Sequence, residues 1–74
     1  MQYVFARAIR KARVASNLTQ LELSGRLGVT RARVSQIESL ASGVDELSFL
    51  RIAEALQITP PELLGYAYEE VEGG

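Results

Sequence analysis

The sequence predicts an all-α fold, and three observations support this fold class. Apolar residues recur at three- and four-residue spacing, helix-capping patterns punctuate the chain, and no segment alternates apolar and polar residues as a strand does. At 74 residues, the chain is long enough for one small core. We therefore expect a compact five-helix domain in residues 1–66, followed by an acidic C-terminal segment, residues 67–74, that is either a tail or a dimerisation arm.

Residues 3–15 form the first expected helix, because their apolar side chains share one face. These side chains are Phe5, Ala8, Ile9 and Ala12. Asn17 follows this helix, and asparagine tolerates the left-handed backbone conformation in which many helices end.

A helix, a tight turn and another helix occupy the centre of the chain. Thr19 and Glu22 form a capping box, in which each side chain satisfies a free backbone N–H group of the other residue. Gly28 ends this second helix, because glycine readily adopts the positive φ of a tight turn. Thr30 then caps a third helix of about residues 30–39.

The third helix has opposite apolar and polar faces. Val34 and Ile37 point one way, whereas Ala32 and Gln36 point roughly the other way. An amphipathic helix that follows a tight turn in this manner is a candidate for reading DNA, with the other helices holding it at a fixed angle.

Two further helices are expected in the C-terminal half. Asp45 caps the fourth helix. Its apolar face is formed by Phe49, Ile52, Ala53 and Leu56. A second capping box, Thr59-Pro-Pro-Glu62, begins a short fifth helix that ends near Gly65, and residues 66–74 show no helical pattern.

Charge is distributed unevenly along the chain. Residues 1–37 hold seven basic residues and one acidic residue, a net charge of +6. Residues 38–74 hold one basic residue and eight acidic residues, a net charge of −7. This asymmetry favours one surface for a polyanion and another turned away from it, although solvated helix faces would give the same pattern.

The composition argues against several function classes. The chain has no cysteine and no histidine, so disulfides, thiolate metal sites and histidine acid–base catalysis are excluded. No nucleophile–base pair or glycine-rich phosphate loop is evident, and we expect no enzyme, cofactor, metal or small-molecule ligand. The apolar runs are too short to span a membrane and the N-terminus lacks a signal-peptide pattern, so we expect a cytoplasmic protein.

The order of these motifs resembles the lambda-repressor-like (Xre/Cro) helix-turn-helix family. The resemblance covers residues from about Ile9 to Leu64 and rests on several runs at the family's spacing. These runs are Ile9-Arg-Lys-Ala-Arg13, Leu18-Thr-Gln20, Leu23-Ser-Gly-Arg-Leu-Gly-Val29, Val34-Ser-Gln-Ile-Glu38, Leu50-Arg-Ile-Ala-Glu-Ala-Leu56 and Leu63-Leu64. The resemblance implies that the second and third helices form the motif and that the third enters the major groove of double-stranded DNA.

The resemblance also implies roles for particular residues. The positions that usually face base edges are Arg31, Ala32, Arg33 and Gln36. An arginine here could hold guanine bidentately, and the glutamine could pair with adenine. Contacts to the DNA backbone are expected from Thr19, Gln20, Ser35, Arg10 and Lys11, the last two of which could equally be solvated surface charges. Arg13 and Glu38 match a pair that often forms a partly buried salt bridge.

We therefore expect a sequence-specific DNA-binding transcriptional regulator, with repression as the expected mode, that acts as a homodimer on a palindromic operator. The expected dimer surface consists of Leu63, Leu64, Tyr66, Tyr68 and Val71, which could instead close the core. The alternative is a protein-interaction module of the same fold, such as an antitoxin or a regulatory adaptor that binds a partner protein.

Several residues depart from the family pattern. Ser39-Leu40 follows Glu38 where the family usually has Asn-Gly, so we expect the third helix to run about a turn longer. Gly25 lies inside the second helix, at a cost of about 1 kcal/mol relative to alanine.

Overall fold

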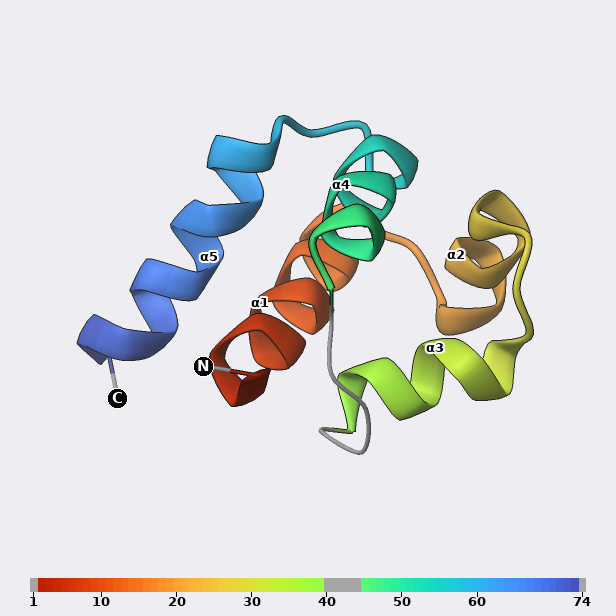
Figure 1. Ribbon diagram of the computed structural model, residues 1–74, viewed down its shortest axis with the longest axis horizontal. Coiled ribbons are helices and arrows are strands. Elements are labelled where there is room, and N and C mark those ends of the chain that lie inside the picture. Colours follow the sequence, from red (N-terminus) through yellow and green to blue (C-terminus); the bar gives the residue numbers. More distant parts are fainter. Residues whose placement is uncertain (1, 40–44, 74) are drawn as a thin grey trace.

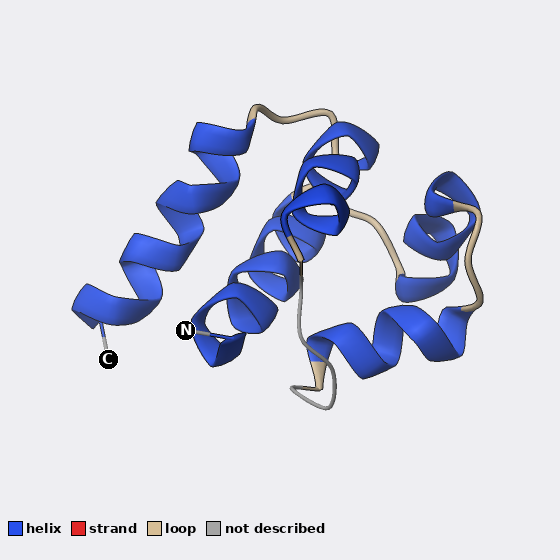
Figure 2. Cartoon of the chain, in the orientation of Figure 1, coloured by secondary structure: helices blue, strands red, loops and turns tan. Residues whose placement is uncertain are grey.

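Five helices make up the part of the chain that the computed structural model describes, residues 2–39 and 45–73. They are α1 (Gln2–Ala15), α2 (Gln20–Leu27), α3 (Arg31–Glu38), α4 (Glu46–Ala55) and α5 (Pro60–Gly73). None of the described residues forms a strand, and the predicted all-α fold is confirmed (Figure 2). In Figure 1, α1 and α4 lie at the centre, with α5 packed along one side and the α2–α3 pair on the other.

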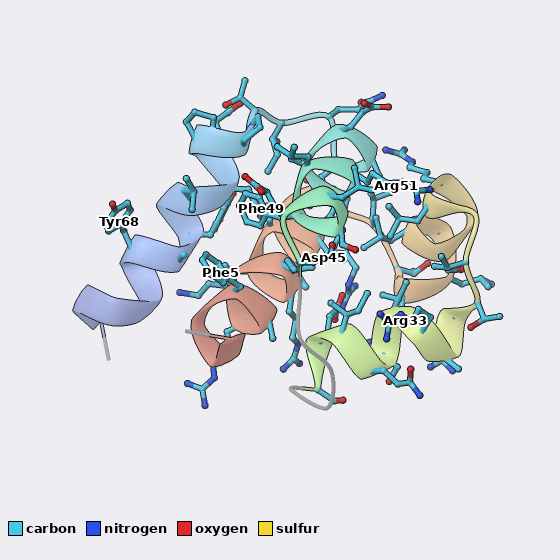
Figure 3. All side chains as sticks on the ribbon, viewed as in Figure 1. Phe5, Arg33, Asp45, Phe49, Arg51 and Tyr68 are labelled. Carbon is cyan, nitrogen blue, oxygen red and sulfur yellow. The ribbon has the colours of Figure 1, made fainter. Side chains whose placement is uncertain are left out.

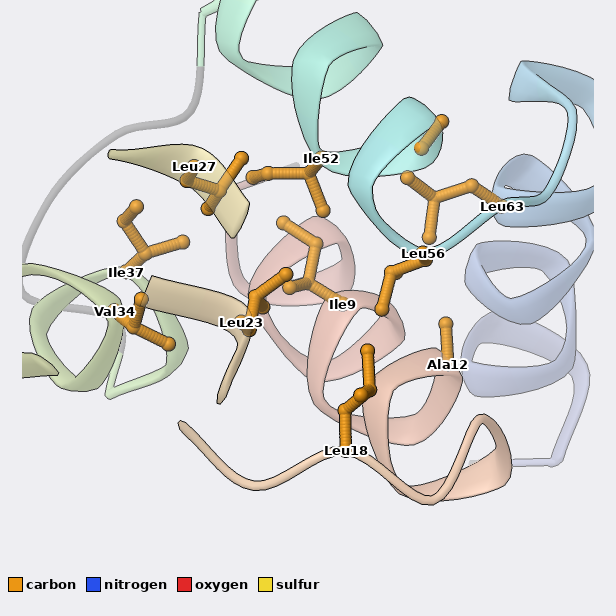
Figure 4. Close-up of a cluster of buried hydrophobic side chains, with 11 residues drawn as sticks. Ile9, Ala12, Leu18, Leu23, Leu27, Val34, Ile37, Ile52, Leu56 and Leu63 are labelled. Carbon is orange, nitrogen blue, oxygen red and sulfur yellow. The ribbon is translucent and has the colours of Figure 1, made fainter. Parts of the chain in front are cut away.

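One apolar core lies where the helices meet, and all five helices contribute to it (Figure 4). Ile9 of α1 and Leu23 of α2 are among its most deeply buried large side chains. The other members are Ala12, Leu18, Leu27, Val34, Ile37, Ile52, Ala53, Leu56 and Leu63. Because α3 supplies only Val34 and Ile37 to this cluster, most of its surface faces away from the core.

All four predicted helix caps form in the structure, at Thr19, Thr30, Asp45 and Thr59. In the first capping box, the Thr19 hydroxyl accepts a hydrogen bond from the Glu22 backbone N–H at 3.0 Å. The Glu22 carboxylate accepts one from the Thr19 N–H at 2.9 Å. These bonds fix where each helix begins, because they satisfy N–H groups that have no partner within the helix.

Three helices end through a residue in the left-handed conformation. Asn17 and Gly28 have φ values of 60° and 71°, as predicted, and Gln57 also has a φ of 60°. After each of these residues the chain folds back, and the next N–H donates to a carbonyl of the preceding helix at 3.0–3.1 Å. The turn between α2 and α3 therefore has the geometry expected of a glycine.

The fifth helix is longer than predicted. The expected end near Gly65, with a non-helical segment after it, is wrong, because α5 continues to Gly73. Leu63 and Ala67 lie four residues apart on one helical face and are both buried, so packing extends the helix past the predicted boundary. The division at residue 66 therefore falls within a single helix, and residues 67–73 are helical.

The third helix spans about the predicted residues 30–39, counting its caps, but lacks the expected additional turn. It ends at Glu38, where the backbone N–H of Ser39 donates to the Ser35 carbonyl at 2.9 Å, so the expected additional turn is wrong. The Ser39 hydroxyl also donates to the Gln36 carbonyl at 3.1 Å, a local bond that competes with continued helix. Leu40 lies outside the described residues.

Candidate nucleic-acid interface

A salt bridge between α1 and α3 anchors the central motif. Arg13 and Glu38 form the expected pair, with Nε to Oε2 at 2.7 Å and Nη2 to Oε1 at 3.0 Å. The Arg13 Nη1 atom also donates to the Leu18 carbonyl at 2.7 Å, and Gln20 Nε2 donates to Glu38 Oε1 at 3.3 Å. The two charged side chains are only 11% and 3% exposed, so the network is largely protected from water. It holds α3 against α1 and the start of α2 through directional bonds.

The outer face of α3 is polar and open to solvent. Arg31, Ala32 and Gln36 are exposed, whereas Val34 and Ile37 are buried on the opposite side. This is the division that the helical periodicity predicted. The helix therefore presents one guanidinium, one methyl group and one amide on a face that no other described part of the protein covers.

Arg33 lies on a different side of α3 from these residues. It is exposed, but it lines a small hollow together with Ser48 and Ile52 of α4, and thus faces α4 rather than directly outward. Asp45 begins α4 nearby, and Figure 3 shows Arg33 and Asp45 in the region between α3 and the start of α4. The Ser48 backbone N–H, aided by the positive charge of Arg33, holds the pKa of the Asp45 carboxyl below its ordinary value.

The expected backbone-contacting residues occupy three separate places. Thr19 is exposed at the start of α2, whereas the Gln20 amide is half-buried and bonded to Glu38. Ser35 is half-buried on α3. Arg10 and Lys11 are exposed on α1, where they border a shallow hollow of about 590 Å³ that is lined by α1 residues. The structure thus brings Thr19, Gln20 and Ser35 to the α2–α3 motif and leaves the two α1 cations outside it.

Two arginines bond to backbone carbonyls in a way that the sequence did not predict. Arg26 of α2 donates from Nη1 to the Ala55 carbonyl at the end of α4, at 2.8 Å. Arg51 of α4 donates from Nη2 to the Leu27 carbonyl at the end of α2, at 3.0 Å. Each helix therefore supplies a cation to the C-terminus of the other, where free carbonyls and the helix dipole favour positive charge.

The expected dimer surface requires correction. Leu63 is fully buried, so it closes the core and cannot contact a second molecule. Tyr66 is half-buried and packs against the core. Leu64 and Tyr68 are exposed, and Tyr68 projects outward from α5 (Figure 3). The Val71 side chain lies outside the described part of the structure.

Exposed apolar residues also occur on α4, and one of them, Leu50, lines the same hollow as Leu64 of α5. Leu47 and Leu50 of α4 are 66% and 46% exposed. Beside them lies a hollow of about 450 Å³. It is lined by Phe5, Phe49, Leu50, Pro60 and Leu64, with Asp45 and Glu46 at its acidic side. The Phe5 and Phe49 rings meet edge to face, with centroids 5.6 Å apart. We call Leu47, Leu50, Leu64 and Tyr68 the α4–α5 apolar patch.

Other types of site find little support among the described residues. Across residues 5–39 and 45–68, whose side chains the structure describes, no group of three acidic side chains is placed to hold a metal ion. In the same part of the chain, no helix is both long and apolar enough to cross a membrane.

Comparison with known proteins identifies the motif. A helix-turn-helix family model matches residues 9–63, which include the salt bridge, the turn and the whole of α3. The chain belongs to the lambda-repressor-like (Xre) helix-turn-helix family. The fold of this family is that of DNA-binding regulators. The match gives no support to an enzymatic function.

Solved structures of family members have the same fold. The restriction-modification controller protein C.AhdI from Aeromonas hydrophila has a TM-score of 0.76 and 32% identity, over 84% of this chain and 94% of that one. An XRE-family like protein from Pseudomonas syringae pv. tomato has a TM-score of 0.78 and 27% identity, over 93% and 85%. The clp gene regulator ClgR from Corynebacterium glutamicum has a TM-score of 0.87 and 20% identity, over 93% and 90%. No curated protein sequence matches this Xre-family chain significantly.

Proposed function

We propose that this protein is a sequence-specific transcriptional repressor that binds a palindromic DNA operator as a homodimer in the cytoplasm. The observation that carries the proposal is the outward face of α3, held in place by the Arg13–Glu38–Gln20 network. A helix fits the major groove and can read its distinct pattern of donors and acceptors. The description of C.AhdI as a restriction-modification controller supports a regulatory role.

The residues of the outer face supply complementary chemistry. Arg31 can donate two hydrogen bonds to guanine, and Gln36 can pair with the donor and acceptor of adenine. Ala32 offers a methyl contact to thymine. The start of α2, with Thr19 exposed, offers N–H groups and a positive dipole end to a phosphate of the same strand.

Selection from random duplex DNA is the direct test of this function. We expect enrichment of a palindrome whose half-sites lie about 34 Å apart, because one domain reads few base pairs. If each subunit neutralises about three phosphates, the logarithm of the binding constant should fall with the logarithm of salt concentration at a slope of about −5. A slope near zero would contradict the proposal. A protein partner that survives nuclease treatment, with no DNA enriched, would indicate an interaction module instead.

Substitutions on α3 test the individual roles. Arg31→Ala or Gln36→Ala should each cost about 1–3 kcal/mol on the selected operator and relax the preference at one base pair. Glu54→Gln, an exposed change on α4, is the control that should leave base preference unchanged. Equal weakening on every sequence would assign the substituted residue to a phosphate contact.

The homodimer is proposed to form through the α4–α5 apolar patch. Exposed leucines on two neighbouring helices are the kind of apolar surface that a protein interface covers. Leu64→Glu or Leu47→Glu should give a monomer in sedimentation equilibrium and should weaken operator binding. Val14→Glu replaces an equally apolar side chain, 58% exposed on α1, and should leave the dimer intact. A Leu64→Glu protein that remains dimeric would place the interface elsewhere.

A further inference from the structure

Two hydrogen bonds join α2 and α4 in opposite directions. Arg26, in the last turn of α2, donates from Nη1 to the carbonyl of Ala55, the last residue of α4, at 2.8 Å. Arg51, within α4, donates from Nη2 to the carbonyl of Leu27, the last residue of α2, at 3.0 Å. Each bond joins a cation to a carbonyl that has no partner within its own helix. We call this pair of bonds the α2–α4 clamp.

The clamp adds direction to a contact that is otherwise apolar. Leu23 and Leu27 of α2 and Ile52 of α4 belong to the same buried cluster. Apolar burial is non-directional, and a hollow of about 60 Å³ beside Leu27 and Ile52 leaves room for the two helices to shift. Hydrogen bonds weaken steeply with misalignment, and a charged donor makes them stronger. Two such bonds at different points of both helices therefore fix the angle between α2 and α4.

The clamp lies between the two surfaces that the proposed function uses. On one side, the turn after Leu27 leads into α3, and the Val29 N–H holds this turn to α2 by donating to the Ser24 carbonyl at 3.0 Å. On the other side, α4 carries Leu47 and Leu50 of the α4–α5 apolar patch. The salt-bridge network with α1 holds the opposite end of α3. Without the clamp, the α2–α3 motif could turn about that network.

We propose that Arg26 and Arg51 are positioning residues that set the distance between the two reading helices of the homodimer, and hence the half-site spacing of the operator. The inference rests on the proposed function and on its dimer through the α4–α5 apolar patch. The molecule measures 31 × 24 × 21 Å, so a rotation of about 8° over the middle dimension moves α3 by about 3.4 Å, one base-pair step. A shifted half-site is reached only if the clamp distorts, and the free energy of its hydrogen bonds then opposes binding.

Operators that combine the selected half-sites with a spacer one base pair longer or shorter test the clamp. Arg26→Met and Arg51→Met remove the donors and retain a long apolar side chain. We expect each variant to reduce the ratio of affinities for the selected and shifted operators by about two- to tenfold, the factor that corresponds to one net hydrogen bond. The double variant should reduce this ratio further. Base preference within a half-site should remain unchanged, because the residues of α3 are unaltered.

Two control variants separate spacing from stability and from charge. Ile9→Val removes a methylene group from the core, so it lowers stability but should leave the affinity ratio unchanged. Arg10→Met removes an exposed cation of α1 outside the clamp, and should change binding by the same factor at every spacing.

An affinity ratio that stays the same in clamp variants that are folded by circular dichroism would overturn the inference and leave the proposed function standing. A Leu64→Glu protein that remains dimeric would also overturn it, because the clamp would then not join the motif to the interface. A wild-type protein that selects no duplex would overturn the inference and the proposed function together.

Discussion

Loss of the Arg13 guanidinium should be among the most destabilising single changes in this domain. Arg13→Leu would leave the Glu38 carboxylate buried, with the Gln20 amide at 3.3 Å as its remaining side-chain donor. The Leu18 carbonyl would lose its donor as well. Leaving one partner of a buried pair uncompensated costs about 3–5 kcal/mol. A chain of 74 residues has a total stability of roughly 4–11 kcal/mol, so this loss is a large fraction of the whole.

The assay is urea unfolding followed by circular dichroism, with the free energy extrapolated to water. The double variant Arg13→Leu/Glu38→Leu should recover most of the loss, because a well-packed apolar pair can replace a buried ion pair. Glu54→Gln, which changes an exposed acid, should stay within about 0.5 kcal/mol of wild type. A loss below about 1 kcal/mol for Arg13→Leu would refute the reasoning, because the pair would then behave as an exposed one.

Three further predictions concern stability. Gly25→Ala should raise the melting temperature by about 4–8 °C. Gly25 lies within α2, a Cβ added there would contact no other atom, and alanine favours a helix by about 1 kcal/mol over glycine. A lower melting temperature would contradict this. Arg51→Ala should cost about 1 kcal/mol in urea unfolding, because the Leu27 carbonyl loses its donor, and an unchanged midpoint would exclude this role. Stability should fall as pH falls through and below the ordinary carboxyl range, because backbone N–H hydrogen bonds lower the pKa of three capping carboxyls in the folded state. The three carboxyls are those of Glu22, Asp45 and Glu62. Replacing all three by amides should flatten the pH dependence of stability, and an unchanged pH dependence would contradict this cause.

The helix starts could be predicted from sequence because capping is a local interaction. The Thr19 hydroxyl accepts from the Glu22 N–H, and the Glu22 carboxylate accepts from the Thr19 N–H. The two residues lie three positions apart, so the residue types and their spacing carry the signal. The outward phase of α3 followed in the same way from helical periodicity. The pairing of Arg13 with Glu38 spans 25 residues, and it could be expected only through the resemblance to a family.

The features that could not be predicted depend on tertiary contacts. Arg26 and Arg51 donate to backbone carbonyls 29 and 24 residues away, and a carbonyl is the same at every residue, so no residue type marks the acceptor. The length of α5 depends on packing, because the acidic residues near its end are unfavourable at a helix C-terminus. That packing also buries Leu63, which a sequence pattern alone does not distinguish from the exposed Leu64 beside it.

Because α3 is short, DNA recognition by this helix depends on the folding of the whole domain. A helix of eight residues is too short to persist by itself in water, and this one buries only Val34, Ile37 and Glu38. Without its packing against the other helices α3 would not stay helical, so unfolding of the domain removes the DNA-binding surface. The population able to read DNA is then the folded population. An operator that binds this surface would in turn protect every helix of the domain from exchange, including those far from the DNA.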